Sequence, residues 1–202
     1  LPEEIRPLLD IINPNAILLS KETQSVFLKE KGMKIDLGAL AKGYIADRIA
    51  DFLKAEKVTS ALINLGGNVL TFGPAFHNPD HKWRIGIQNP KETRNTNLMV
   101  LAIRDKSVVT SGIYERTFEI DGKTYHHIFN SQTGYPVSSD LASLTIISSL
   151  SVDGEIWTTR LFGSSLEHIF QEVSSQAELE AIIVDKDNHC FQTGGIYKMR
   201  IS

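Results

Sequence analysis

Apolar residues recur at helical spacing in the segment 38–57, which is the clearest periodicity in the chain. Apolar positions follow one another at steps of three or four and charged residues fall between them: Ala41, Ile45, Ile49, Phe52 and Leu53 against Arg48, Asp51 and Lys54. This pattern predicts a long amphipathic helix. Similar spacing predicts shorter helices over residues 1–12, 151–163 and 165–176.

Shorter apolar or alternating runs predict strands over most of the remaining chain. They cover residues 16–20, 25–36, 61–73, 83–90, 98–105, 107–112, 115–129, 141–149, 179–187 and 190–200. Asp121-Gly122 divides the run 115–129, as the turn of a two-residue hairpin does. Strands outnumber helices and several neighbours are joined by hairpins. The sequence therefore predicts one mixed α+β domain over residues 1–202, with helices packed on a largely antiparallel sheet rather than on a doubly wound parallel one.

The bulk composition is that of a globular protein with a sizeable core. The net charge of -3 over 202 residues lacks the basic footprint of a nucleic-acid-binding protein. No stretch approaches the roughly 20 apolar residues of a membrane-spanning helix, so we expect no transmembrane segment in this chain. Cys190 is the single cysteine, which excludes an internal disulfide and a multi-cysteine metal site.

Asp36, Gly38 and Lys42 lie at the start of the predicted long helix. A helix N-terminus presents unpaired N–H groups and a partial positive charge, which suit a phosphate group. Gly38 lets the backbone approach a ligand, Lys42 can reach a phosphate oxygen, and the loop carbonyls before the helix can bind a hard cation. An ordinary capped helix with a surface lysine explains the same residues equally well.

A double glycine, Gly66-Gly67, interrupts the predicted strand 61–73 just before Asn68. Glycines permit positive φ and leave a surface free of side chains, which can form a floor for a planar ring or a pyrophosphate. A bulge or tight turn gives the same pattern. By itself, the pattern favours the turn.

Two adjacent histidines, His126 and His127, end the predicted hairpin 115–129. Neighbouring side chains on a strand point to opposite faces, so one histidine can face a site but the two cannot easily chelate one metal. A polar turn containing Asn130, Thr133 and Gly134 follows. By itself, a histidine beside such a turn is more often structural than catalytic.

The predicted helix 151–163 combines carboxylates with hydroxyls. Glu155 and Thr159 are four residues apart and share a helical face. A carboxylate and a hydroxyl on one face can hold Mg²⁺, which prefers oxygen ligands. Asp153 can assist from the N-cap. The alternative is that Asp153 caps the helix and Glu155 interacts with the helix dipole.

Four stretches in order resemble the FAD:protein FMN transferase family, also called the ApbE family. They are "DLGALAKGYIAD", "LINLGGNVLTFG", "SGIYERTFEIDGKTYHHIFNSQTGYP" and "GEIWTTRLF", and the likeness runs from about residue 1 to residue 170. The resemblance implies an α/β, T-fold-like domain in which helices pack on antiparallel sheet. It implies an enzyme that splits FAD with the help of Mg²⁺, attaches FMN to a threonine or serine of an acceptor protein through a phosphodiester, and releases AMP.

The resemblance also assigns residues to the expected site. Asp36 and Lys42 match FAD-contacting positions, and the backbone oxygen of Ala39 matches a metal ligand. The nucleotide cleft is then lined by Gly66, Gly67, Ser111, Tyr114, His127 and Ile128. Thr159 matches a metal-binding threonine, and Glu155 replaces the family's metal-binding aspartate. His127 is the candidate base for the acceptor hydroxyl, because a histidine titrates near neutral pH.

The family likeness leaves two other functions open. Glu155 and Asn130 depart from the family's aspartates, which is compatible with a non-catalytic FAD-binding module. A Mg²⁺-dependent pyrophosphatase that gives FMN and AMP needs only water as the nucleophile. The resemblance further implies that the chain lacks the N-terminal part of the full-length protein, and that the full-length protein is extracytoplasmic and lipid-anchored.

Overall fold

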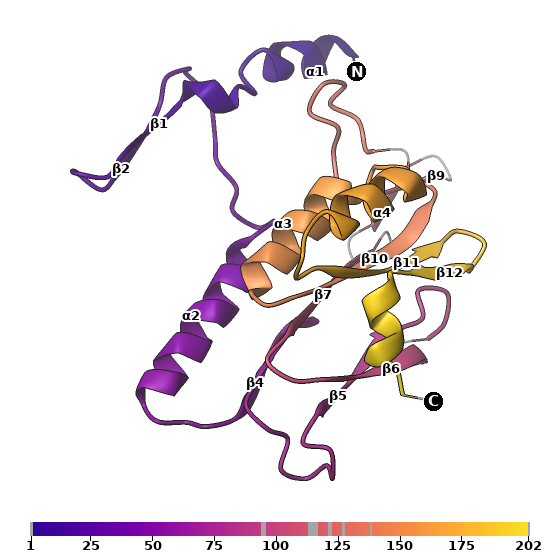
Figure 1. The fold of residues 1–202 in the computed structure, drawn as a ribbon. Helices are drawn as coiled ribbons and strands as arrows, with labels where there is room; N and C mark the ends of the chain where they lie inside the picture. Colours follow the sequence, from indigo (N-terminus) through magenta and orange to yellow (C-terminus); the bar gives the residue numbers. More distant parts are fainter. Residues whose placement is uncertain are drawn as a thin grey trace. The chain divides into compact units, whose positions relative to one another are not determined.

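The computed structural model of the chain describes residues 2–93, 96–112, 117–120, 123–126, 128–137 and 139–201. The chain divides into two compact units (Figure 1). Unit 1 comprises Leu1–Leu37 and Phe118–Val137, and unit 2 comprises Gly38–Thr117 and Ser138–Ser202. The single domain expected from the sequence stays a prediction.

Unit 1 is built from a helix, a short 3₁₀ helix and hairpins. Its elements are α1 (Pro2–Leu9), η1 (Pro14–Ala16), β1 (Ile17–Ser20), β2 (Ser25–Leu28), β8 (Thr117–Ile120) and β9 (Lys123–His126). The strands pair as β1 with β2 and β8 with β9. The predicted strand 25–36 ends early, at Leu28, because a turn closed by Met33 N–H donating to the Glu30 carbonyl (3.2 Å) follows it.

Unit 2 is organised around a six-stranded sheet in which every neighbouring pair is antiparallel, as predicted. The strand order is β12-β11-β10-β7-β4-β3. The strands are β3 (Ala61–Leu65), β4 (Asn68–Phe72), β7 (Ser107–Gly112), β10 (Leu141–Ser148), β11 (Glu180–Asp185) and β12 (Cys190–Gln192). The central strand β10 is buried along its whole length.

Helices cover one face of this sheet, and a hairpin covers the other. The helices are α2 (Ala41–Ala55), α3 (Ser151–Leu161) and α4 (Leu166–Ser174), and the hairpin joins β5 (Trp83–Gln88) to β6 (Asn97–Ile103). Val109 of β7 faces α3, since a Cβ on Gly154 would lie 2.5 Å from its Cγ2. Val108 therefore points to the other face, where it belongs to the apolar core that includes Ile85 and Leu101 of the hairpin.

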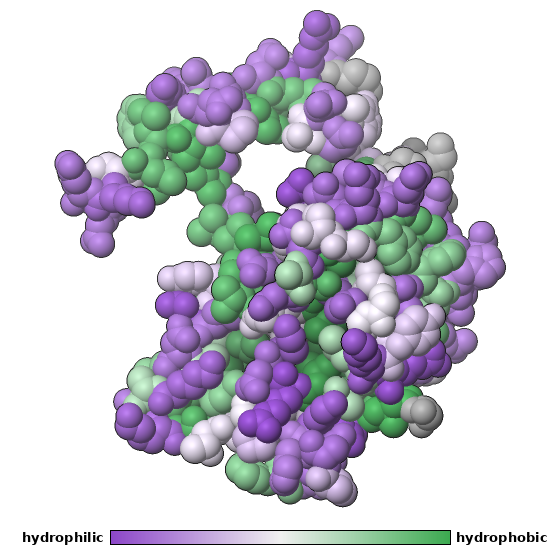
Figure 2. Space-filling model, viewed as in Figure 1, coloured by the Kyte–Doolittle hydropathy of each residue, from purple (hydrophilic) through white to green (hydrophobic). Residues whose placement is uncertain are grey.

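The buried face of α2 differs from the face that the apolar spacing predicted. Gly43, Ala46, Asp47 and Ala50 are buried, whereas Ile45 and Phe52 are 48% and 63% exposed. The reason is close packing: a Cβ on Gly43 would lie 2.5 Å from the Ser151 carbonyl oxygen of α3. Only small residues fit there, so Ile45 and Phe52 point outward, while Ile49 and Leu53 are partly buried against the core. Figure 2 shows hydrophobic residues among hydrophilic ones on the face viewed.

The C-terminal segment forms less strand than predicted. The run 190–200 continues as β12 only to Gln192, and a 3₁₀ helix, η2, follows at Gly194–Lys198. The Glu180 carboxylate accepts hydrogen bonds from the Thr193 hydroxyl and from Gly195 N–H, and these bonds turn the chain into η2. None of the helices in the described residues is both long and apolar enough to cross a membrane.

Gly66 and Gly67 form the two-residue turn of the β3–β4 hairpin, in agreement with the turn interpretation. Their φ angles are +62° and +95°, and Gly67 N–H donates to Asn64 Oδ1 at 2.9 Å. Such a turn needs positive φ at both positions, which glycine adopts without strain. A Cβ at either glycine would meet no heavy atom within 4 Å, so backbone conformation alone limits substitution.

We therefore expect the two glycines to differ in their tolerance of asparagine. The φ of Gly66 lies in the left-handed helical region that asparagine tolerates, whereas the φ of Gly67 lies beyond it. Gly66→Asn should leave the free energy of unfolding nearly unchanged, and Gly67→Asn should lower it by about 1–2 kcal/mol. Urea unfolding of the two variants measures the difference, and equal losses would contradict the turn geometry.

Candidate active site

The N-terminus of α3 is capped from a neighbouring helix. Asp47 of α2 is 6% exposed, and its carboxylate oxygens accept hydrogen bonds from Ser151 N–H at 2.8 Å and Val152 N–H at 2.9 Å. Leu150, at the N-cap position, makes no side-chain cap. The alternative in which Asp153 caps this helix is therefore wrong, because the N-cap position is Leu150 and Asp153 lies inside the first turn of α3.

Glu155 of α3 lies at the centre of a group of polar side chains from three elements. Its side chain is almost fully buried, and the residue is 5% exposed. Asn68, the first residue of β4, donates from Nδ2 to Glu155 Oε1 at 2.8 Å. Lys42, in the first turn of α2, places Nζ 3.4 Å from the same oxygen. A cation and an amide thus share one carboxylate oxygen of Glu155.

Two serines extend this group into the sheet. The Ser151 hydroxyl donates to Asn68 Oδ1 at 2.6 Å, and Ser107 Oγ of β7 lies 3.0 Å from both Ser151 Oγ and the Val69 carbonyl oxygen. Ser107, Ser151 and Asn68 are almost completely buried. Buried polar groups that satisfy one another in this way hold a single arrangement, because any change leaves a donor or acceptor unpaired.

The structure brings together part of the site expected from the sequence. Lys42, Glu155 and the strand that follows Gly66-Gly67 meet in unit 2, although they come from three separate stretches. Ala39 lies in an exposed turn just before α2, and Thr159 is exposed one turn beyond Glu155 on α3. Ser111 is half-buried on β7, opposite Leu144 of β10.

The remaining expected residues lie elsewhere or outside the described residues. Asp36 and Ile128 belong to unit 1, where Asp36 is exposed and Ile128 is half-buried. Tyr114 and His127 lie outside the described residues, so their predicted places in the cleft and the base role of His127 stay predictions.

The oxygen atoms in this part of unit 2 fit a magnesium ion by their chemistry. Within the described part of the chain, no hydrogen bond engages Glu155 Oε2, the Ala39 carbonyl oxygen or the Thr159 hydroxyl. A carboxylate, a carbonyl and a hydroxyl are hard oxygen donors of the kind that Mg²⁺ selects. The donor set expected from the sequence is therefore available for a hard cation.

The neighbouring carboxyl of Asp153 is in a different electrostatic state from an ordinary surface aspartate. Partial burial raises its pKa, and the negative charge of Asp47 raises the pKa further. Glu155, by contrast, has Lys42 and Asn68 within bonding reach. Glu155 thus has a cation and an amide donor beside its carboxylate, whereas Asp153 faces the negative charge of Asp47.

These residues lie inside a match to a known protein family. The model of the ApbE family matches residues 1–183 of this chain. The chain belongs to the ApbE family.

Relatives named FAD:protein FMN transferase are similar to this ApbE chain over most of its length. The protein from Klebsiella pneumoniae (strain 342) is 46% identical over 184 residues, which cover 91% of this chain and 56% of that protein. The protein from Treponema pallidum (strain Nichols) is 36% identical over 178 residues, which cover 85% and 49%. The chain thus spans about half the length of these relatives.

Solved ApbE structures share the fold. The ApbE protein from Thermotoga maritima superimposes with a TM-score of 0.88 at 27% identity, covering 100% of this chain and 64% of that one. Flavinyl transferase ApbE from Pseudomonas stutzeri gives a TM-score of 0.76 at 24% identity, covering 95% and 57%. The predicted fold class, helices packed on antiparallel sheet, is therefore confirmed.

Three residues of the site had no role in the sequence-based interpretation of this ApbE chain. Asn68 was noted only as the end of the double-glycine motif, and Asp47 and Ser151 only as parts of helices. The position of Asp47 in the sequence does indicate that it is buried. It is four residues after Gly43, on the small-residue stripe of α2, and a carboxylate among glycine and alanine needs a buried partner.

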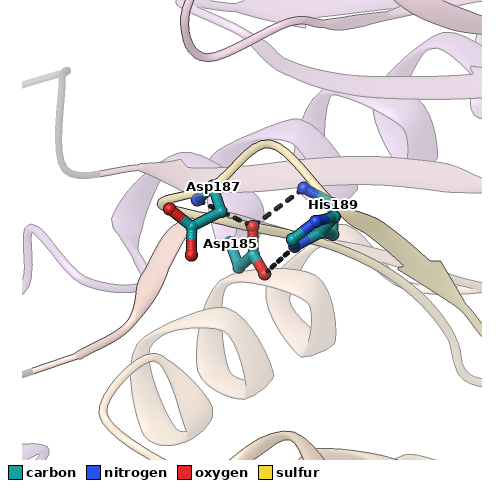
Figure 3. Close-up of side chains that lie close together, drawn as sticks. All are labelled: Asp185, Asp187 and His189. Carbon is teal, nitrogen blue, oxygen red and sulfur yellow. Dashed lines mark hydrogen bonds and ion pairs between the residues drawn. The ribbon is translucent and has the colours of Figure 1, made fainter.

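A second group of potential ligands lies far from this site in the fold, at the β11–β12 hairpin. Asp185, Asp187 and His189 bring their ligand atoms within 4.8 Å of one another (Figure 3). Asp185 Oδ1 accepts from Asp187 N–H and His189 N–H at 2.9 and 2.8 Å, and Asp185 Oδ2 lies 2.9 Å from His189 Nδ1. Both oxygens of Asp185 therefore hold the turn itself, which explains the cluster without a metal.

This turn should respond to acid. Desolvation acts to raise the pKa of Asp185, but hydrogen bonds from the His189 ring and from the two N–H groups outweigh it, so the net pKa is lowered. A lowered folded-state pKa stabilises the fold above the unfolded pKa of about 3.9, and that stabilisation disappears as the pH falls through the folded value. Asp185→Asn should therefore be less stable than wild type at pH 6.

The pH dependence provides the check on this turn. Urea midpoints of wild type and Asp185→Asn, measured from pH 6 downward, should converge once the pH falls below the folded pKa of Asp185. A difference between the two urea midpoints that stays constant down to pH 2 would contradict the role of the ionised Asp185 carboxylate.

Proposed function

We propose that the protein to which this chain belongs transfers FMN from FAD to a threonine or serine of an acceptor protein, with Mg²⁺ bound and AMP released. Two features support the proposal: the ApbE family membership and the names of the relatives. The single observation that carries it is the meeting of Lys42, Asn68 and Glu155 beside the Gly66-Gly67 turn. A cation, a buried carboxylate and an open glycine turn are parts that a pyrophosphate site needs.

Lys42 supplies positive charge at the place where phosphate oxygens would gather. It lies in the first turn of α2, where the helix dipole adds a partial positive charge. Its ion pair with Glu155 holds the ammonium group near the start of the helix while the side chain stays 40% exposed. Attack on a pyrophosphate develops charge on the phosphoryl oxygens, and a fixed cation offsets that charge.

The candidate metal ligands are the Ala39 carbonyl, Glu155 and Thr159. When bound there, Mg²⁺ supplies a Lewis acid that polarises a phosphoryl oxygen. Glu155 replaces the family's aspartate, and its contacts with Asn68 and Lys42 support it as the carboxylate ligand. Asp153, two residues earlier on α3, is the alternative carboxylate.

The proposed reaction is a balanced phosphoryl transfer. The hydroxyl oxygen of the acceptor forms a bond to the FMN phosphorus, and the bond from that phosphorus to the bridging oxygen of AMP breaks. The hydroxyl proton goes to His127, which we propose as the general base. Gly66 and Gly67 leave room for the nucleotide because their turn carries no side chains.

Mass spectrometry of the acceptor tests the proposal. The purified protein is incubated with FAD, Mg²⁺ and a candidate threonine-containing acceptor, and parallel samples contain EDTA or omit the acceptor. We expect the acceptor to gain the mass of FMN only with Mg²⁺, and AMP to appear in equal amount. Free FMN without acceptor would instead support hydrolysis, and FAD binding without AMP would support a binding module.

The family likeness also leads us to propose an extracytoplasmic, lipid-anchored location for the full-length protein. Fractionation of cells that express it, with metabolic labelling by a fatty acid, tests this location. Recovery of the unlabelled protein in the cytoplasmic fraction would contradict it.

A further inference from the structure

Asn68 is a buried residue of the site to which the proposed reaction gives no role. It is 1% exposed, and its amide joins Glu155 to the sheet. We propose that Asn68 is a positioning residue, which holds Glu155 so that Oε1 stays bound to protein groups and Oε2 stays available to a divalent cation. This inference rests on the proposed function, because that function assigns Glu155 to the cation.

The hydrogen bonds around Asn68 fix which end of its amide faces Glu155. The Glu155 carboxylate only accepts hydrogen bonds, so the amide end that faces it is the donor, and the other end, Oδ1, accepts from the Ser151 hydroxyl at 2.6 Å. The Nδ2 end then faces Glu155 Oε1 at 2.8 Å. A reversed amide would place its oxygen against the carboxylate and lose the Ser151 bond, which is costly for buried groups.

Asn68 is itself held rigidly. It begins β4 and lies opposite Leu65 in the β3–β4 hairpin, immediately after the glycine turn. Glu155 is 87 residues away in the chain, on a helix. The Asn68 amide therefore anchors the Glu155 side chain of α3 to strand β4.

Glutamate needs such positioning more than aspartate does. It has one more rotatable bond, so more side-chain freedom is lost when its carboxylate takes one orientation. Lys42 and Asn68 both contact Oε1, and no described residue donates to Oε2. These two contacts on Oε1 set the direction in which Oε2 points. Hydrogen bonds that neighbouring residues make to a metal-binding side chain orient it in this way in many proteins.

Binding of Mn²⁺, measured by the loss of the free-ion EPR signal, tests the positioning role without relying on activity. Wild type is compared with Asn68→Ala, Glu155→Gln and the double variant. Asn68→Ala should weaken Mn²⁺ binding about tenfold or more. Because Asn68 acts through Glu155, the double variant should bind no more weakly than Glu155→Gln alone.

Thr145→Val is the matched control. Thr145 is buried on β10 and shares a 2.8 Å hydrogen bond with Thr110 of β7. Val109 faces α3, so its neighbour Thr110 and the partner Thr145 lie on the opposite face of the sheet from Glu155. This control should lower stability in urea while leaving the Mn²⁺ affinity unchanged.

The outcomes separate the positioning role from a purely structural one. If Asn68→Ala loses stability but binds Mn²⁺ as Thr145→Val does, or if its effect adds to that of Glu155→Gln, the inference is overturned. If Asn68→Ala does not fold, Ser151→Ala takes its place, since it frees the amide to rotate. Ser151→Ala should weaken Mn²⁺ binding severalfold, and wild-type affinity there would also overturn the inference.

The same titrations distinguish this inference from the proposed function. Mn²⁺ binding that Glu155→Gln does not weaken would overturn both the cation assignment and the role of Asn68. Mn²⁺ binding that depends on Glu155 and Asn68, in a protein that never adds FMN to an acceptor, would count against the proposed transfer alone.

Discussion

Replacing Glu155 by glutamine should reduce kcat/KM for FMN transfer by about 100-fold or more, the loss that follows removal of one group stabilising charge in a transition state. Glutamine keeps the shape of the side chain. Its carbonyl oxygen can still accept from Asn68 and Lys42, as Oε1 does now. The amide nitrogen then occupies the place of Oε2 and cannot bind a cation. Steady-state assays over a range of Mg²⁺ concentrations measure the change.

Glu172→Gln is the control for this substitution. Glu172, on α4, pairs with Arg160 of α3 at 3.0 Å, so it is a glutamate ion-paired to the same helix but outside the proposed site. Its activity should stay at the wild-type level. Equal activity of Glu155→Gln and Glu172→Gln at all Mg²⁺ concentrations would show that Glu155 has no part in the reaction.

Replacing Asp47 by alanine should lower the free energy of unfolding by about 3 kcal/mol. The substitution removes two hydrogen bonds to a charged acceptor and leaves the N–H groups of Ser151 and Val152 unpaired. It also opens a gap on the tightly packed face of α2. Urea unfolding followed by circular dichroism measures the loss.

Asp51→Ala gives the comparison within the same helix. Asp51 lies one turn further along α2 and pairs at the surface with Arg48 at 2.7 Å. A surface ion pair of this kind contributes only about 0.5 kcal/mol. A loss for Asp47→Ala that is no larger than that for Asp51→Ala would mean that Asp47 does not hold α3 in place.

The spacing of apolar residues and the positions of turn-forming residues predicted most of the helices and strands. The Gly66-Gly67 break became a hairpin turn, and the helices and most strands lie where apolar spacing placed them. The apolar stripe of α2 matched its buried face only in part: Ile49 and Leu53 pack against the core, but Ile45 and Phe52 are exposed, because spacing counts apolar residues and ignores size. Where another backbone comes as close as α3 comes to Gly43, volume decides which side chains face inward.

Only part of the site was open to this kind of inference. The helix-start pattern pointed to Lys42, the spacing of Glu155 and Thr159 pointed to Glu155, and the family resemblance supported both. The contact between them, and the roles of Asn68 and Asp47, depend on residues that are distant in the chain: Asn68 and Glu155 are 87 positions apart, Asp47 and Ser151 are 104 apart, and Lys42 and Glu155 are farther apart still. No local pattern encodes such pairs, since each is created when the helices and strands assemble.

Gly43 of α2 packs against the start of α3, and Gly154 of α3 packs against β7, and these close contacts have a genetic consequence. A side chain at Gly43 would collide with the backbone of Ser151 and Val152, and one at Gly154 would collide with Val109. Either collision displaces the helix that bears Glu155. A random mutagenesis screen for lost flavin transfer should therefore recover substitutions at these two glycines beside those at charged positions, although neither glycine has any chemistry of its own to lose.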